Sequence, residues 1–220
     1  MQARTIRSFI NRQRRLSHHQ QKILHEGWRI YGLEISAGEA PINKILTKNA
    51  QLVLEIGFGA GTTILNYAHK YPHQNILGIE VYQPGIVALL TQLKTHPLNN
   101  IYLYREDAIL VLQQCVPDAS LSKVLIFFPD PWPKRRHHKR RLIQPQFIEL
   151  LQKKLKPQGI LHIATDWEDY ANFIISVLKN NKAFIQISSV AYAVADRIPT
   201  KFAHKGMQQN HPIFDLLFVR

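Results

Sequence analysis

Cysteine is nearly absent from this sequence. Cys115 is the only one among 220 residues, so no disulfide can form within the chain and a reducing compartment is expected. We expect its thiol to act as a small apolar core group on a helix. Long apolar runs are also missing: none approaches the roughly 20 residues that a membrane-spanning helix needs. No apolar signal core accompanies the basic start of the chain. The sequence therefore predicts a cytoplasmic protein with no membrane partner.

Acidic residues are scarce as well. There are 15 Asp and Glu against 28 Lys and Arg, which gives a net charge of +13 and a pI near 10.0. Such an excess favours a polyanionic partner, and nucleic acid is the first candidate. The alternative interpretation is a basic protein whose charge serves only solubility. The first 25 residues hold no acid at all. We expect residues 1–30 to be a basic arm, flexible or in contact with RNA and including a short helix from Ser17, and residues 31–220 to form one domain.

Short apolar runs alternate with amphipathic segments from residue 51 onward. The runs are apolar on both faces, which is typical of a doubly wound, mostly parallel α/β sheet with helices on both sides. Strands are expected at 51–56, 75–81, 100–104, 123–128, 159–165, 183–191 and 212–219. Helices are expected at 62–70, 109–115 and 170–178. Two more are expected to begin at Pro84 and at Pro145, and Pro157 and Gly159 would end the second of them.

Five of the few acids stand where expected strands end. In doubly wound sheets ligands bind beyond the carboxyl ends of the strands, and the acids there are Glu55, Glu80, Asp107, Asp130 and Asp166. Glycines at the first turn would let the backbone approach a ligand closely; they are Gly57, Gly59 and Gly61.

The nature of the ligand follows from these acids. Thr62 stands where the dinucleotide fingerprint needs a glycine, and the Glu55 carboxylate would repel phosphates. Glu80 is placed to accept hydrogen bonds from ribose hydroxyls, and Asp107 from an adenine amino group. A ligand with an adenosine and a positive centre, but no phosphate, matches all three acids.

The segments "LEIGFGAG", "GIEV" and "REDA" resemble the successive cofactor motifs of S-adenosylmethionine-dependent methyltransferases. The resemblance implies a Rossmann-like sheet of seven strands with the last one antiparallel. It implies S-adenosylmethionine as the cofactor, without a metal. The cofactor-binding residues would be Glu55, Gly57, Gly59, Gly61, Glu80, Asp107 and Asp130.

The segment "FFPDPWPKRRHHKRR", residues 127–141, follows the fourth strand. Its prolines restrict the backbone around Asp130, whose two carboxylate oxygens match the adjacent N–H donors of guanine. Trp132 either stacks on a base or packs against the protein. The basic run beyond it is suited to RNA phosphates and comprises Arg136, His137, His138, Lys139, Arg140 and Arg141.

Together with "ATDWEDYA" and "RIPTKFAHKG…FDLLF", this segment is similar to the tRNA (guanine-N7)-methyltransferase family over nearly the whole chain. The resemblance implies methylation of the variable-loop guanosine at position 46 of tRNA, with Asp130 as the catalytic residue and residues 136–141 binding RNA. The substrate contacts would be Lys134, Asp166, Thr200, Lys201 and Phe202. Ala203 stands where the family usually has glutamate, which leaves the guanine contacts of that loop open.

Other interpretations remain at this stage. The sequence is also compatible with a methyltransferase that acts on another RNA, and with a non-catalytic RNA-binding protein that has a methyltransferase fold. An NAD-dependent dehydrogenase is disfavoured by Thr62 and Glu55. The adjacent histidine pairs, at 18–19 and 137–138, lack the spacing of a metal site. The sequence leaves open whether the chain is a monomer or a homodimer.

Overall fold

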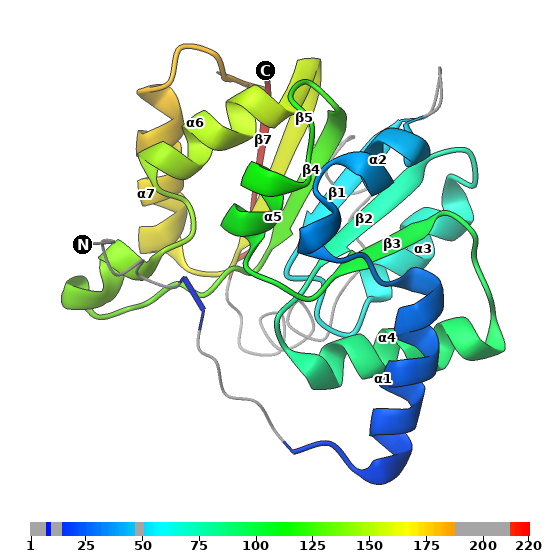
Figure 1. Ribbon diagram of the computed structural model, residues 1–220. Coiled ribbons are helices and arrows are strands. Elements are labelled where there is room, and N and C mark those ends of the chain that lie inside the picture. The colour runs from blue at the N-terminus through cyan, green and yellow to red at the C-terminus, as the bar shows by residue number, and fades with distance from the viewer. Residues whose placement is uncertain (1–7, 10–14, 47–50, 188–211) are drawn as a thin grey trace, which may run out of the picture.

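The computed structural model describes residues 8–9, 15–46, 51–187 and 212–220 (Figure 1). The strands are β1 (Leu52–Ile56), β2 (Asn75–Ile79), β3 (Ile101–Tyr104), β4 (Leu121–Phe127), β5 (Leu155–Thr165), β6 (Ile185–Gln186) and β7 (Phe214–Val219). The α-helices are α1 (His18–Tyr31), α2 (Ala40–Ile45), α3 (Thr62–Lys70), α4 (Gln83–Thr95), α5 (Ala108–Gln114), α6 (Pro145–Lys154) and α7 (Glu168–Lys179). Two 3₁₀ helices are η1 (Ile35–Ala37) and η2 (Arg135–Arg140).

The strands form one seven-stranded sheet in the order β3-β2-β1-β4-β5-β7-β6. The pairs from β3 to β5 are parallel, and β7 runs antiparallel to both β5 and β6. This confirms the predicted doubly wound, mostly parallel sheet with an antiparallel last strand. The strand order reverses between β1 and β4, which is where this class of fold binds ligands.

Two hydrophobic clusters cover the two faces of the sheet, because side chains alternate along each strand. Leu52, Leu54 and Ile56 of β1 face one cluster, whereas Val53 faces the other. Helices α2, α5, α6 and α7 supply the first cluster, and α1, α3 and α4 supply the second. Cys115 is buried in the first cluster, directly after α5.

Local sequence explains where several helices begin. The Ser17 side chain accepts from the Gln20 N–H, and the Gln20 side chain accepts from the Ser17 N–H, so α1 starts with a capping box. Pro84 and Pro145 lie in the first turns of α4 and α6, where a missing N–H costs nothing.

The structure differs from the expected boundaries in three places. Helix α1 packs against α4 and buries Ile23, Leu24 and Tyr31, so residues 18–30 belong to the folded domain rather than to a free arm. Strand β5 begins at Leu155, before Pro157, and its pairing with β4 shifts register between Leu121 and Lys123. Of the strand expected at 183–191, β6 covers only 185–186, and residues 188–191 lie outside the described part of the chain.

The described residues contain neither a helix that could span a membrane nor a group of metal-ligating side chains. No helix there is both long and apolar enough to cross a membrane. The same residues contain no group of three or more His, Cys, Asp or Glu side chains that could hold a metal ion.

Candidate active site

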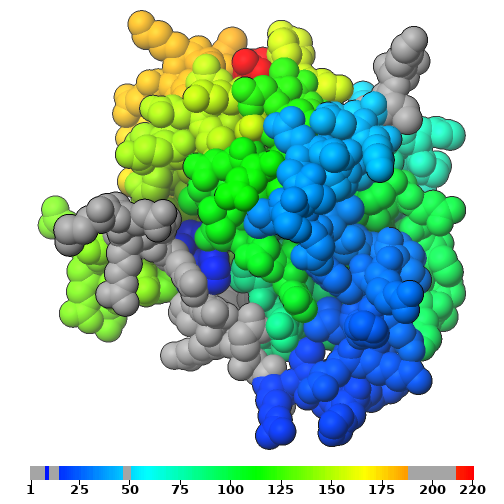
Figure 2. Space-filling view, in the orientation of Figure 1, coloured from blue at the N-terminus to red at the C-terminus, as the bar shows by residue number. Residues whose placement is uncertain are grey.

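A cavity of about 200 Å³ lies at the carboxyl ends of β1, β2 and β4. It thus occupies the place where the sheet order reverses. It is lined by residues 56–57, 79–81, 106, 108, 126–130 and 142, together with Ser8 and Phe9 from the start of the chain. In Figure 2 the dark-blue atoms of residues 8–9 lie against the green surface of the middle of the chain, apart from the blue surface of α1. Ser8, Phe9 and Glu106 are lining residues that the sequence reasoning missed.

The glycine turn after β1 presents bare backbone to open space. Gly57 and Gly59 have φ angles of +77° and +54°, and a Cβ on either would meet nothing within 4 Å. On the other side of the turn, a Cβ on Gly85 of α4 would lie 2.4 Å from the Gly59 carbonyl oxygen. The turn is therefore pressed against α4 and open toward its other side, which is what close approach of a ligand to the backbone requires.

Glu80, directly after β2, fastens this turn. Its Oε2 accepts the Gly59 N–H at 2.8 Å, and its Oε1 accepts the N–H groups of Val81 at 2.7 Å and Tyr82 at 2.9 Å. A carboxylate oxygen can accept two hydrogen bonds, so Oε2 keeps one site for a further donor. Contact with a ribose hydroxyl stays a prediction, and this geometry is compatible with it.

Glu55 lies beside the cavity without lining it. The residue is 3% exposed, and its Oε2 has no hydrogen-bond partner among the described residues. Burial, reinforced by the nearby charge of Glu80, raises the pKa of Glu55 from 4.5 to about 8. A buried carboxyl without a partner is costly, and a cationic group bound nearby would favour its ionised form. The unpaired Oε2 and the open glycine turn together fit the positively charged, phosphate-free ligand predicted from the sequence.

Asp107 caps α5. Its Oδ1 accepts the Ile109 N–H at 2.8 Å, and its neighbours Glu106 and Ala108, but not Asp107 itself, line the cavity. One carboxylate oxygen is thus used to start the helix. The predicted contact with an adenine amino group could use Oδ2 or the remaining acceptor site of Oδ1.

Asp130 is exposed at the rim of the cavity, on a strained loop. Although the residue as a whole is exposed, neighbouring protein atoms partly desolvate its carboxyl and raise its pKa above the ordinary aspartate value. Phe128 and Trp132 on either side have φ angles of +52° and +46°, which non-glycine residues rarely adopt. The Phe128 N–H donates to the Ala164 carbonyl at 2.8 Å, so the start of the loop is tied to β5.

Trp132 packs inside the protein. It is 8% exposed, and its Nε1 donates to the Ser8 carbonyl at 3.1 Å. The Arg140 guanidinium lies 4.5 Å from the ring centroid, and the His137 ring meets it edge-on. Of the two interpretations left open by the sequence, the structure therefore favours packing over base stacking.

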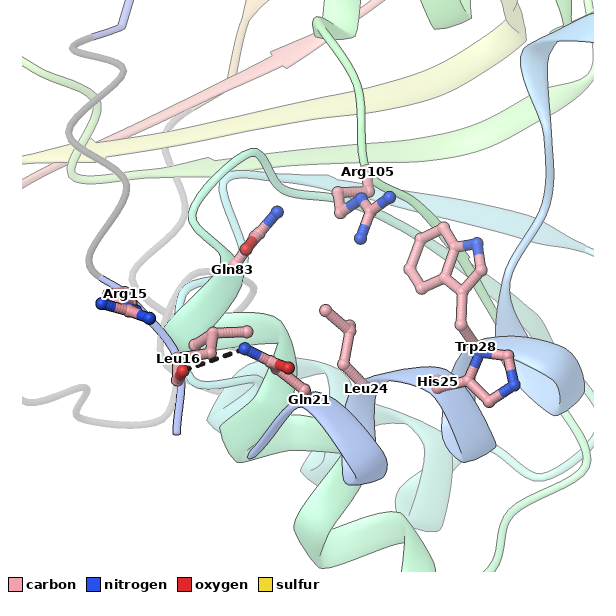
Figure 3. Close-up of a pocket in the computed structure, with 8 residues that line it drawn as sticks. All are labelled: Arg15, Leu16, Gln21, Leu24, His25, Trp28, Gln83 and Arg105. Carbon is pink, nitrogen blue, oxygen red and sulfur yellow. Dashed lines mark hydrogen bonds between the residues drawn. The ribbon is translucent and has the colours of Figure 1, made fainter. Parts of the chain in front are cut away.

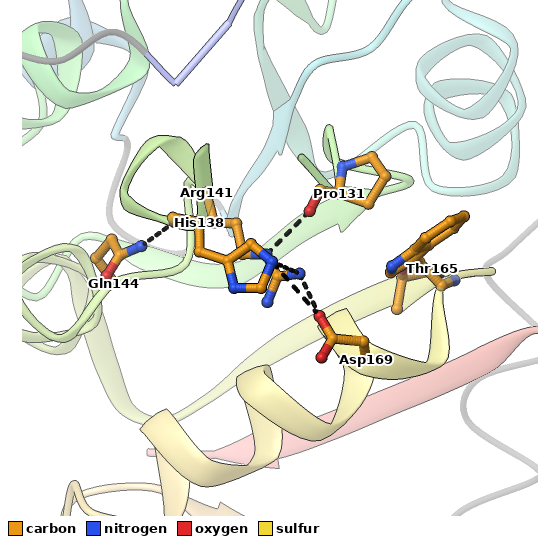
Figure 4. A network of polar contacts seen from close by, with 7 residues as sticks. Pro131, His138, Arg141, Gln144, Thr165 and Asp169 are labelled. Atoms are coloured by element: carbon orange, nitrogen blue, oxygen red, sulfur yellow. Dashed lines mark hydrogen bonds and ion pairs between the residues drawn. The ribbon is translucent and has the colours of Figure 1, made fainter. Parts of the chain in front are cut away.

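The predicted RNA-binding run divides into exposed and buried members. Arg136 and Lys139 are exposed on η2, and His137, His138 and Arg140 are half-buried. Arg141 is only 2% exposed: its Nε donates to the Pro131 carbonyl at 2.9 Å, and its Nη2 pairs with Asp169 of α7 (Figure 4). The structure therefore disfavours the predicted RNA contact of Arg141, because its guanidinium is buried and already engaged by Pro131 and Asp169.

The structure describes two of the remaining predicted substrate residues. Lys134 is exposed just before η2, and Asp166 is half-buried directly after β5. Neither lines the cavity. Thr200, Lys201, Phe202 and Ala203 lie outside the described residues, so their substrate contacts stay predictions.

The sheet order and the antiparallel last strand are those of the Rossmann-like methyltransferase fold. Two solved structures share the fold: the 16S rRNA methyltransferase KamB, with a TM-score of 0.58 over 82% of this chain and 91% of that one, and the aminoglycoside resistance methyltransferase NpmB1, with 0.55 over 82% and 92%. Each is 11% identical in sequence, so the likeness concerns the fold alone.

Comparison with curated sequences is more specific. The model of a family described as "Putative methyltransferase" matches residues 49–216. The chain is 47% identical to the tRNA (guanine-N(7)-)-methyltransferase of Nitrosococcus oceani, over 100% of this chain and 92% of that one. It is 43% identical to the enzyme of that name from Ectopseudomonas mendocina, over 100% and 93%. The chain belongs to the tRNA (guanine-N(7)-)-methyltransferase family.

Proposed function

We propose that this protein transfers a methyl group from S-adenosylmethionine to N7 of a guanine in tRNA and so forms 7-methylguanosine. Similarity to enzymes of that name over the full chain carries the proposal. The guanosine would be the variable-loop one at position 46. The reaction would take place in the cytoplasm, where its substrate is found.

The chain's own residues would hold the cofactor, which supplies an electrophilic methyl group when bound. Gly57 and Gly59 leave the backbone of the turn accessible. Glu80 would accept a ribose hydroxyl at the free site of Oε2 while it keeps the turn closed on α4. Glu55 would offset the positive charge, since its buried Oε2 has no hydrogen-bond partner among the described residues.

Asp130 would orient the guanine base. N7 has a free lone pair at neutral pH, so no general base is needed to create the nucleophile. The two carboxylate oxygens of Asp130 would each accept one hydrogen bond, from two adjacent N–H groups of guanine. The negative charge of the carboxylate would stabilise the positive charge that develops on the ring. Asp166, at the end of the neighbouring strand β5, would assist.

Exposed cations beside the Asp130 loop would bind the tRNA backbone. Lys134, Arg135, Arg136 and Lys139 are all exposed in or next to η2. They would recognise shape and phosphates rather than sequence. The target base must leave its tertiary contacts in tRNA, at a cost of about a few kcal/mol.

Labelled S-adenosylmethionine and unmodified tRNA test the proposal directly, with the product nucleoside identified after digestion. We expect 7-methylguanosine from tRNA, and no methyl uptake into a tRNA that lacks guanosine at position 46. Methylation of another base, or of 16S rRNA but not tRNA, would refute the proposal. Cofactor binding by calorimetry without any methyl transfer would favour the non-catalytic RNA-binding alternative.

Asp130→Asn tests the assigned role of the carboxylate. Turnover should fall about 100-fold or more, the typical cost of losing a group that stabilises transition-state charge, while tRNA affinity is retained. Glu149→Gln, an exposed acid on α6, is the matched control and should leave turnover unchanged. Full activity of Asp130→Asn would show that the carboxylate charge has no part in the reaction.

A further inference from the structure

A second pocket, of about 490 Å³, lies between the start of the chain, α1, α4 and the end of β3 (Figure 3). Leu24, His25 and Trp28 come from α1, Gln83 from the first position of α4, and Arg105 from the residue after β3. Arg15, Leu16 and Gln21 complete the lining. In Figure 3 these side chains surround an open space. Nothing in the proposed transfer of the methyl group uses this pocket.

The lining combines an aromatic ring with positive charge. It contains two arginines, a histidine and two amide side chains, and no acid. An adjoining hollow shares Arg15, Leu16 and Gln21 and is likewise lined without an acid. An indole face together with guanidinium groups suits a flat base joined to a phosphate, and side-chain amides can donate to and accept from a base edge. The chemistry of the pocket is therefore that of a nucleotide site.

Trp28 is held in place before any ligand arrives. Its Nε1 donates to Glu34 Oε1 at 2.8 Å. Its ring lies against Gly32, where a Cβ would come within 2.4 Å of the indole. The Arg105 guanidinium lies 5.4 Å from the ring centroid. Among the described residues, no acid lies within ion-pairing distance of Arg105, so its charge is available to a ligand.

The pocket is next to the cofactor cavity. Arg105 lines the pocket, and the following residue, Glu106, lines the cavity. Val81 lines the cavity, and Gln83, two residues later, lines the pocket. A polynucleotide bound at Asp130 would therefore meet the pocket on the side of the cavity formed by the ends of β2 and β3.

We propose that this pocket is a second nucleotide-binding site that holds one nucleotide of the tRNA substrate, with its base against Trp28 and its phosphate near Arg15 and Arg105. The inference rests on the proposed function, because it assumes that tRNA is the polynucleotide. It adds a second contact region, remote in sequence from the basic segment of residues 134–140.

Binding and turnover of Arg105→Gln and Trp28→Leu test the pocket. Trp28→Leu should weaken tRNA binding between about fivefold and a hundredfold, the range for losing one stacked base. Trp28→Phe should recover part of that loss. Arg105→Gln should lower by about one the slope of log Kd against log salt, as expected for one phosphate contact. In all three variants KM for tRNA should rise with little change in kcat, and cofactor affinity by calorimetry should stay at the wild-type value.

Arg29→Gln is the matched control for charge, because Arg29 is exposed on the same helix and does not line the pocket. It should leave the salt slope unchanged. Photocrosslinking of bound tRNA supplies a readout independent of variant stability, and a crosslinked peptide that includes Trp28 is expected.

Three results would overturn the inference. One is unchanged tRNA binding by folded Arg105→Gln and Trp28→Leu. Another is an equal loss with Arg29→Gln, which would indicate only a diffuse charge effect. The third is tight binding of free guanosine or adenosine monophosphate that is abolished by Arg105→Gln while tRNA affinity is unchanged. The pocket would then be a site for a small molecule. If the wild-type protein does not methylate tRNA at all, the proposed function fails, whatever the pocket binds.

Discussion

Replacing Arg141 by methionine should destabilise the protein and slow methyl transfer without removing an RNA contact. The side chain lies inside the protein between the Asp130 loop and α7. Its guanidinium lies 4.8 Å from the ring centroid of Tyr170 and 5.2 Å from that of Phe173. Methionine retains most of the volume and removes the charge and all donors, so the variant isolates the polar contacts from the packing.

The magnitude follows from these contacts. A hydrogen bond from a charged donor contributes about 1.5–3 kcal/mol, and each desolvated cation–π contact about 1–2 kcal/mol. The Asp169 side chain is 63% exposed, so water would replace the lost arginine. Loss of this ion pair therefore adds little to the loss of stability. Methionine recovers part of the packing, which leaves a net loss of roughly 2–4 kcal/mol. For a protein of this size, that lowers the Tm by roughly 5–15 °C.

Urea unfolding and single-turnover methylation measure the two effects separately. We expect a lower urea midpoint, slower methyl transfer at saturating tRNA, and tRNA affinity close to that of wild type. Arg141→Lys should recover only part of the stability, because lysine lacks the planar fork that reaches two acceptors. Arg136→Gln is the exposed control, and it should weaken tRNA binding while unfolding at the wild-type midpoint. Wild-type stability of Arg141→Met combined with weaker tRNA binding would refute the reasoning and return Arg141 to the RNA surface.

Two further predictions concern the cofactor site. Because the pKa of buried Glu55 is about 8 in the folded protein against 4.5 ordinarily, the unfolded chain holds fewer protons between these values. Stability of the ligand-free protein should therefore fall as pH rises from about 4.5 to 8. Urea midpoints across that range should show the fall in wild type and lose it in Glu55→Gln; an equal fall in both would assign it to other groups. Gly85→Ala should weaken cofactor binding at least about tenfold by calorimetry, because the new Cβ meets the Gly59 carbonyl. Gly27→Ala should not, since the atoms nearest to its Cβ belong to the Leu90 side chain and not to the glycine turn.

Local sequence patterns were sufficient for the sheet and for the position of the candidate active site. Strands apolar on both faces indicate burial by helices on both sides, and that topology brings the ends of β1, β2 and β4 together. Glu80 and Asp130 were therefore placed at the cavity by periodicity and the strand-end rule alone. The capping role of Asp107 is likewise a local property, since its partner is the N–H two residues on.

Contacts between distant segments could not be read from those patterns. In "RRHHKRR", Arg136 and Arg141 look equivalent, and only the turn of η2 against α7 buries the second and exposes the first. The hydrogen bond from Trp132 to the Ser8 carbonyl joins residues 124 positions apart. Helix α1 seemed part of a basic arm because it directly follows the basic start of the chain, and its buried side chains, Ile23, Leu24 and Tyr31, are outnumbered by His, Gln and charged residues. In each case tertiary packing, which leaves no local signal, decided the outcome.

The Asp130 loop shows why such distant contacts matter for the site. Positive φ angles at Phe128 and Trp132 cost about 1–3 kcal/mol each and persist only where the surroundings enforce them. Three hydrogen bonds do so: Phe128 donates to Ala164 in β5, Trp132 donates to Ser8, and Arg141 donates to Pro131. These anchors lie in β5, in the start of the chain and beyond η2. The position of the Asp130 carboxylate is thus set jointly by β5, by a segment that lines the cavity and by the residue that directly follows η2, which are far apart in the sequence.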